Sequence, residues 1–185
     1  FLSLTILLSL MMGCGFGLAP VVTNPEEEET EEEQGEVLNP APEITFGCPE
    51  EASYTVVPGE NTGWSAGSLE RQFFAEFPIN MDQPVGIIFA WHGVGDSSAN
   101  WRANVPMDPN ADPDFPFIVI TPTSTQMSPL SQPAGIDWDI FESSANDDNR
   151  EAALFESIVG CLSSQQNIDT RRIYTGGFSG GALVS

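Results

Sequence analysis

The chain has 185 residues, of which 41% are hydrophobic, so it is long enough and apolar enough to form one domain with a substantial core. Its 27 acidic side chains stand against five basic ones, and the net charge of -22 excludes nucleic acid as an expected partner, because phosphate binding needs clustered cations. This charge fits an exported protein or one adapted to salt. With one histidine and no Cys-x-x-Cys pattern, the sequence has no metal-ligand spacing, and we expect neither a metal nor a cofactor.

The chain opens with an apolar run over residues 1–12, followed by Gly13 and Cys14. The run is too short to span a bilayer and is typical of the apolar part of an export signal. Because no Met and no basic segment precede it, we expect residues to be missing at the N-terminus. A small residue before a cysteine resembles the lipobox of bacterial lipoproteins, in which the cysteine is acylated, and Gly15 resembles sorting to the outer membrane.

We therefore interpret residues 1–14 as a lipoprotein signal peptide with Cys14 as the lipidated residue. The protein would be exported and held at the outer membrane or cell surface through this lipid anchor. The alternative is an ordinary signal peptide of a secreted protein, with an incidental cysteine.

Residues 15–44 are rich in Glu and Pro, with eight Glu between positions 26 and 36. Like charges repel along such a segment and nothing in it can be buried, so we expect a disordered linker that holds the following domain away from a membrane. Cation binding by the Glu cluster is the alternative.

Two further cysteines, Cys48 and Cys161, lie in the region after the linker. In an oxidising compartment a disulfide between them would close a long loop, which stabilises a fold by up to about 4–5 kcal/mol in the chain-entropy model. Two buried free thiols are the alternative.

Residues 45–185 have the composition of a folded domain. Apolar runs bounded by Gly or Pro predict buried strands, and a helical spacing of apolar residues predicts one helix. The expected strands cover residues 68–79, 85–93, 115–123 and 171–179, and the expected helix covers residues 147–166, with Phe155, Ile158, Val159 and Leu162 on its apolar face and Asn146 or Asp147 as its N-cap. Strands separated by a helix and long loops indicate an α/β fold with a mostly parallel sheet and flanking helices.

The segment Gly177-Phe178-Ser179-Gly180-Gly181 directly follows the last predicted strand and fits the pattern G-x-S-x-G. In a nucleophile elbow the serine occupies a sharp turn between strand and helix, and the outer glycines let the two backbones pass closely. Ser179 is therefore the candidate nucleophile, and the Gly180 N–H is a candidate donor to the oxyanion. The alternative is a Gly/Ser-rich turn that only ends the strand.

The segment His92-Gly93-Val94-Gly95 follows the most apolar predicted strand. In hydrolases with such an elbow this loop supplies the other oxyanion-hole amide; Val94 is our candidate, and Gly93 and Gly95 let the backbone turn. We expect the His92 ring to organise the loop by hydrogen bonding to nearby backbone. The alternative is a general base for Ser179, against which chain order argues, because in this fold the acid and the histidine follow the serine.

From residue 68 onward the sequence resembles α/β-hydrolases of the polyhydroxybutyrate depolymerase and feruloyl esterase type. The matching segments are Arg71 to Phe73, the His92-Gly93 loop, the strand at Pro122, the Trp loop "DWD" and the run "NIDTRRIYTGGFSGGA". Within that run we expect Asp169 and Arg172 to form a structural pair. We assign no catalytic role to Asp137 and Asp139, whose loop is a candidate border of the substrate cleft.

The resemblance implies a serine esterase that hydrolyses carboxylic esters of polyester or feruloyl/acetyl-polysaccharide type through an acyl-enzyme on Ser179. It also implies that the catalytic Asp and His follow the elbow, so we expect the chain to be truncated after it and inactive by itself. A serine peptidase of the same fold and a non-catalytic surface binding domain remain as alternatives.

Overall fold

The computed structural model describes residues 40–45, 47–49, 54–66, 69–124, 138–139 and 149–185. They fall within one unit, Asn39–Ser185. The predicted signal peptide with Cys14, the predicted linker up to residue 39, and Asp137, Asn146 and Asp147 lie outside the described residues.

The described residues form five strands, two α-helices and one 3-10 helix. In chain order they are β1 (Gly59–Ala66), β2 (Leu69–Glu76), β3 (Val85–Trp91), α1 (Ser98–Asn104), β4 (Phe117–Pro122), α2 (Arg150–Gln165), β5 (Ile168–Gly177) and η1 (Ser179–Leu183).

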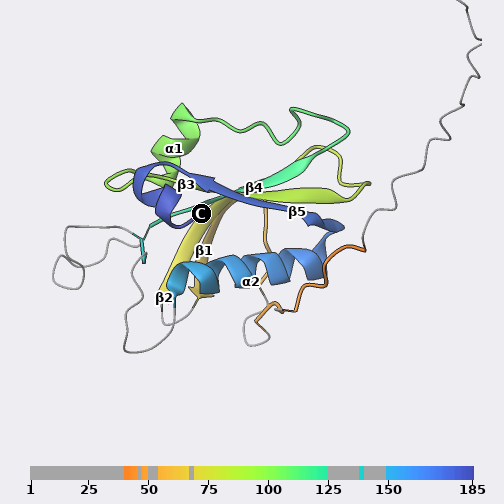
Figure 1. The fold of residues 1–185 in the computed structure, drawn as a ribbon, viewed down its shortest axis with the longest axis horizontal. Coiled ribbons are helices and arrows are strands. Elements are labelled where there is room, and N and C mark those ends of the chain that lie inside the picture. The colour runs from red at the N-terminus through yellow and green to blue at the C-terminus, as the bar shows by residue number, and fades with distance from the viewer. Residues whose placement is uncertain (1–39, 46, 50–53, 67–68, 125–137, 140–148) are drawn as a thin grey trace, which may run out of the picture. The chain divides into compact units, whose positions relative to one another are not determined.

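All five strands belong to one sheet, in the order β1-β2-β4-β3-β5. β3 is parallel to β4 on one side and to β5 on the other, whereas β2 is antiparallel to both β1 and β4. The parallel arrangement predicted from the sequence therefore holds for β3, β4 and β5, and the sheet as a whole is mixed. Figure 1 shows α2 lying along one face of this sheet and α1 on its other side.

The four predicted strands are present, with β5 beginning at Ile168, three residues before the predicted start. The sequence analysis missed β1. Two glycines of this strand, Gly59 and Gly63, have positive φ (98° and 69°), and the pairing with β2 shifts register between Asn61 and Trp64. A glycine-containing, irregular strand has weak propensity and no clean alternation, so its sequence resembles a loop.

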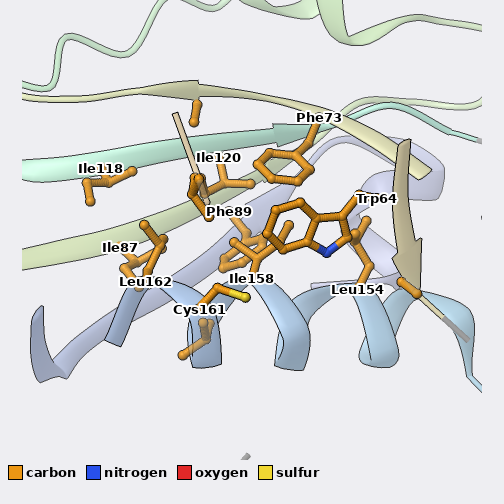
Figure 2. Packing of buried hydrophobic residues seen from close by; sticks show 14 of the residues in the cluster. Trp64, Phe73, Ile87, Phe89, Ile118, Ile120, Leu154, Ile158, Cys161 and Leu162 are labelled. Atoms are coloured by element: carbon orange, nitrogen blue, oxygen red, sulfur yellow. The ribbon is translucent and has the colours of Figure 1, made fainter. Parts of the chain in front are cut away.

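The core lies between α2 and the sheet, where Leu154, Ile158 and Leu162 point toward the strands (Figure 2). β3 is buried along its whole length apart from Ile88, which is partly buried. The largest fully buried side chains are Trp64, Trp91, Trp138, Arg71, Phe73, Phe89, Ile87, Ile118, Ile120, Leu154, Ile158 and Leu162. One of these is charged, and its partner is described below.

The predicted start of the helix is wrong by three residues: α2 begins at Arg150, and Asn149 is its N-cap. The Oδ1 atom of Asn149 accepts hydrogen bonds from the backbone N–H groups of Glu151 and Ala152, each at 3.0 Å. This cap satisfies two of the donors that a helix N-terminus leaves without an intrahelical partner.

The predicted apolar face of α2 is largely confirmed. Ile158, Val159 and Leu162 are buried, but Leu154 occupies the core where Phe155 was expected, and Phe155 is partly buried. The Phe155 ring still packs against Phe89 of β3, with 4.7 Å between ring centroids.

Cys48 and Cys161 are joined by a disulfide, with their Cα atoms 4.2 Å apart. The bond connects the segment that precedes β1 to the C-terminal half of α2. Within the part of the chain that the structure describes, no helix has the length and apolar character needed to cross a membrane.

Candidate active site

Ser179 lies at the corner between β5 and η1, with Phe178 as the one residue between the two elements. Its φ is 53°, and it is the one non-glycine residue with positive φ among the described residues. This conformation costs a non-glycine residue about 1–2 kcal/mol. Ser179 is exposed. An exposed serine held on a strained strand-to-helix turn is the geometry of a nucleophile elbow.

The glycines on either side of Ser179 sit where no side chain fits. A Cβ atom on Gly177 would lie 2.5 Å from the backbone of Gly181, and a Cβ atom on Gly181 would overlap the carbonyl oxygen of Trp91. The Phe178 N–H donates to that same Trp91 oxygen at 3.2 Å, so the corner is docked against the end of β3. Glycine is therefore needed at positions 177 and 181 because the backbones of the corner and of the end of β3 pack so closely there.

The loop after β3 lies directly against this corner. A Cβ atom on Gly93 would be 3.6 Å from the Cβ of Ser179, and a Cβ atom on Gly180 would be 3.5 Å from the backbone nitrogen of Val94. Gly95 has a φ of 76°, which permits the tight turn that the Asp96 N–H closes onto the Gly93 carbonyl at 3.2 Å. The fold thus brings Val94 and Gly180, the two residues that the sequence analysis selected as oxyanion donors, next to one another.

His92 is fully buried, and both of its ring nitrogens contact backbone. Nδ1 lies 2.8 Å from the carbonyl oxygen of Gly93, and Nε2 lies 3.3 Å from the backbone nitrogen of Ser124. A carbonyl can only accept and an N–H can only donate, so Nδ1 carries the proton and Nε2 accepts. The ring therefore ties the loop after β3 to the loop after β4, and neither nitrogen is free to take a proton from Ser179.

Trp138 and Asp139 lie beneath this loop, in the protein interior. The Trp138 indole N–H donates to the carbonyl oxygen of His92 at 2.8 Å. Asp139 is 4% exposed, its N–H donates to Glu151 Oε1 at 3.2 Å, and its Oδ2 lies 3.6 Å from Arg150 Nε. Of the two aspartates placed near the substrate cleft, Asp139 is thus a buried residue held by α2, and Asp137 lies outside the described residues.

Asp169 and Arg172 form the structural pair that was expected, with Oδ2 3.0 Å from Nε. Hydrogen bonds from Arg171, and further from Arg172, hold the pKa of Asp169 at about 2, below its usual value. Arg172 also donates to the carbonyl oxygen of Pro84 at 2.6 Å, which joins the start of β5 to the chain entering β3.

No three His, Cys, Asp or Glu side chains are grouped to hold a metal ion, as far as the described residues extend. The candidate site consists of Ser179, the neighbouring backbone of Val94 and Gly180, and the residues that contact these segments. Sequence reasoning missed the support from Trp138 and from a buried pair, Arg71 and Glu151, because these contacts join residues that are far apart in the chain.

Comparison with known proteins assigns the fold. No family model matches the chain. Feruloyl esterase D of Neurospora crassa is 26% identical over 132 residues, which cover 69% of this chain and 43% of that enzyme. Similar solved structures include native pOPH (TM-score 0.55, 22% identity, 75% of this chain and 49% of that one) and an S-formylglutathione hydrolase from Agrobacterium tumefaciens (TM-score 0.50, 15% identity, 66% of this chain and 49% of that one).

The chain has the α/β-hydrolase fold, as its mixed sheet, helices and strand-to-helix corner at Ser179 indicate. Its sequence similarity is to an esterase. The chain spans less than half the length of that curated relative.

Proposed function

We propose that the protein to which this chain belongs is a serine esterase, with Ser179 as its nucleophile. The observation that carries the proposal is the strained corner at Ser179, which presents an exposed serine against the loop that follows β3. The similarity to a feruloyl esterase supports the same chemistry.

The proposed reaction has an acylation step and a deacylation step. Ser179 Oγ loses its proton to a base and attacks the ester carbonyl carbon, and the Val94 and Gly180 N–H groups donate to the resulting oxyanion. When the intermediate collapses, the C–O bond to the alcohol breaks, the base returns the proton to the alcohol, and an acyl-serine ester remains. Water then attacks that ester with the same base, releasing the acid and restoring the serine hydroxyl.

The base and its acidic partner are proposed to come from parts of the protein outside this chain. The chain contains one histidine, and the nitrogens of its ring are occupied by the backbone of Gly93 and Ser124. The match covers 43% of the related esterase, and we propose that both residues lie in the part of the protein that corresponds to the remainder.

We propose ester-linked polymers as the substrate class, either feruloyl or acetyl esters of polysaccharides or a polyester. The name of the Neurospora crassa relative supports the feruloyl option. Methyl ferulate, acetylated xylan and hydroxybutyrate oligomers would distinguish these groups.

The decisive variant is Ser179→Ala in the full-length protein, assayed with nitrophenyl acetate. We expect hydrolysis to fall to the background rate, because the alanine leaves no nucleophile, while thermal unfolding stays close to that of the parent. Ser65→Ala, on the exposed side of β1, is the matched control and should retain full activity. Activity in Ser179→Ala would refute the proposal, and cleavage of peptide but not ester substrates would favour a serine peptidase.

We further propose that the protein is exported and anchored through a lipid on Cys14. The Cys48–Cys161 disulfide supports export, because such bonds persist in oxidising compartments. Mass spectrometry of the mature N-terminus should find a diacylglyceryl adduct on Cys14, and Cys14→Ser should release the protein from membranes. A mature N-terminus beyond Cys14, without lipid, would contradict the anchor.

A further inference from the structure

The indole ring of Trp138 lies close to both backbone segments that carry the proposed oxyanion donors. Its N–H donates to the His92 carbonyl at 2.8 Å, and a Cβ atom on Gly180 would lie 3.6 Å from its Cδ1. The ring also packs against His92, with centroids 4.6 Å apart, and edge-on against Trp91, with centroids 5.3 Å apart and planes at 90°. Trp138 is fully buried, so no water competes for this hydrogen bond.

The orientation of the His92 carbonyl affects the direction of the amides that follow it in the loop. It belongs to the peptide that joins His92 to Gly93, one residue before the Val94 amide. The loop also contains two glycines, whose backbone dihedral angles are less restricted than those of other residues. A donor fixed at this carbonyl restricts the plane of the peptide and hence the direction of the next amides. Donors that stabilise an oxyanion must be oriented before the reaction, since reorienting them during it costs part of their effect.

Trp138 is itself held by a buried ion pair. Arg71 Nη2 of β2 lies 2.6 Å from Glu151 Oε2 of α2, with 0% and 3% of the side chains exposed. The other oxygen of Glu151 accepts the N–H of Asp139, the residue next to Trp138, at 3.2 Å. Arg71 also donates to the Arg150 carbonyl at 3.4 Å.

A buried ion pair is weak support for stability, because removing both charges from water offsets most of their attraction. This pair has a second effect here. Glu151 uses one oxygen for Arg71 and the other for the backbone of the Trp138 segment, so it fixes that segment to both β2 and α2.

We propose that Trp138 is a positioning residue of the oxyanion loop, and that the Arg71–Glu151 pair acts on the loop through it. The inference rests on the proposed esterase function and deepens it. Because the effect is on the direction of the donors, it should appear in the transition state and not in substrate binding.

The test is Trp138→Phe in the full-length protein, which keeps an aromatic ring and removes the N–H donor. We expect kcat to fall about 10-fold with KM changed less than about twofold, a smaller loss than removing an oxyanion donor itself. Affinity for an arylboronic acid, which forms a tetrahedral adduct on an active serine, should weaken by a similar factor. Trp101→Phe is the matched control: its indole N–H is buried without a partner among the described residues, and its activity should be unchanged.

Because phenylalanine also leaves a cavity, 3-benzothienylalanine at position 138 provides a second variant with the shape of tryptophan and no N–H donor. If the benzothienylalanine variant regains the stability of the parent while its kcat stays low, the proposal is supported. A parent-like kcat in that variant, or in Trp138→Phe, overturns it. The hydrogen bond is measured separately by exchange of the Trp138 indole proton, which should be slow in Ser179→Ala as in the parent. Residual activity in Ser179→Ala refutes the esterase mechanism, whereas rapid indole exchange refutes the contact.

Discussion

Ser179 has a left-handed backbone conformation, which residues other than glycine rarely adopt, and its neighbours explain why it stays there. Gly177 and Gly181 pack against one another and against the end of β3, at separations that leave no space for a Cβ atom. The serine between them is therefore forced into the left-handed region, at a cost of about 1–2 kcal/mol. Local glycine spacing encodes this corner, which is why the sequence alone could identify it.

Gly181→Ala tests this packing. The added Cβ would overlap the Trp91 carbonyl oxygen and lie 2.5 Å from that of His92, so we expect the free energy of unfolding to fall by about 1–3 kcal/mol. Gly176→Ala is the control, because a Cβ at that position has no neighbour within 4 Å. Denaturant titration of both variants should separate them, and equal stabilities would contradict the account of the corner.

The buried pair of Arg71 and Glu151, which supports the site, could not be predicted from a local pattern. Glu151 lies within the predicted helix, and Arg71 belongs to one of the segments that resemble the esterase family. In the fold the two residues meet from β2 and α2, 80 positions apart. No local pattern encodes such a contact, since either residue by itself is typical of an exposed position.

At the scale of elements, the sequence identifies the strands that are buried and regular but not those that are irregular. β3 and β4 are continuous apolar runs, and both were predicted. β1 was missed, because its glycines and its shift of register remove the alternation that marks a strand. The start of α2 was misplaced for a related reason: several residues near 146–149 are good N-caps, and only the fold selects Asn149.

Asn149→Ala should lower the free energy of unfolding by about 1 kcal/mol, because two N–H groups at the start of α2 lose their acceptor. Asn149→Ser keeps a capping oxygen and should stay within a few tenths of a kcal/mol of the parent. Thermal and denaturant unfolding of the two variants provide the measurement. A loss of stability in the serine variant as large as in the alanine variant would argue against capping by this side chain.

At the scale of the whole molecule, the sequence predicted an α/β fold, and the structure has the α/β-hydrolase fold. The antiparallel pairing of β2 with β4 was not predicted, because strand order depends on contacts between segments distant in the chain. The sequence analysis predicted that the elbow and the loop after β3 contribute to one site. Their meeting, with Gly93 against Ser179, follows from β3 and β5 being parallel neighbours.

The Cys48–Cys161 bond also has a mechanical consequence. A pull on the chain from the N-terminal side of Cys48 reaches α2 through the covalent bond before it reaches β1. The force is therefore transmitted to α2, whose apolar side chains are buried in the core, and not to β1 at one edge of the sheet. We therefore expect that force applied from the N-terminal side does not separate β1 from β2 while the disulfide is intact.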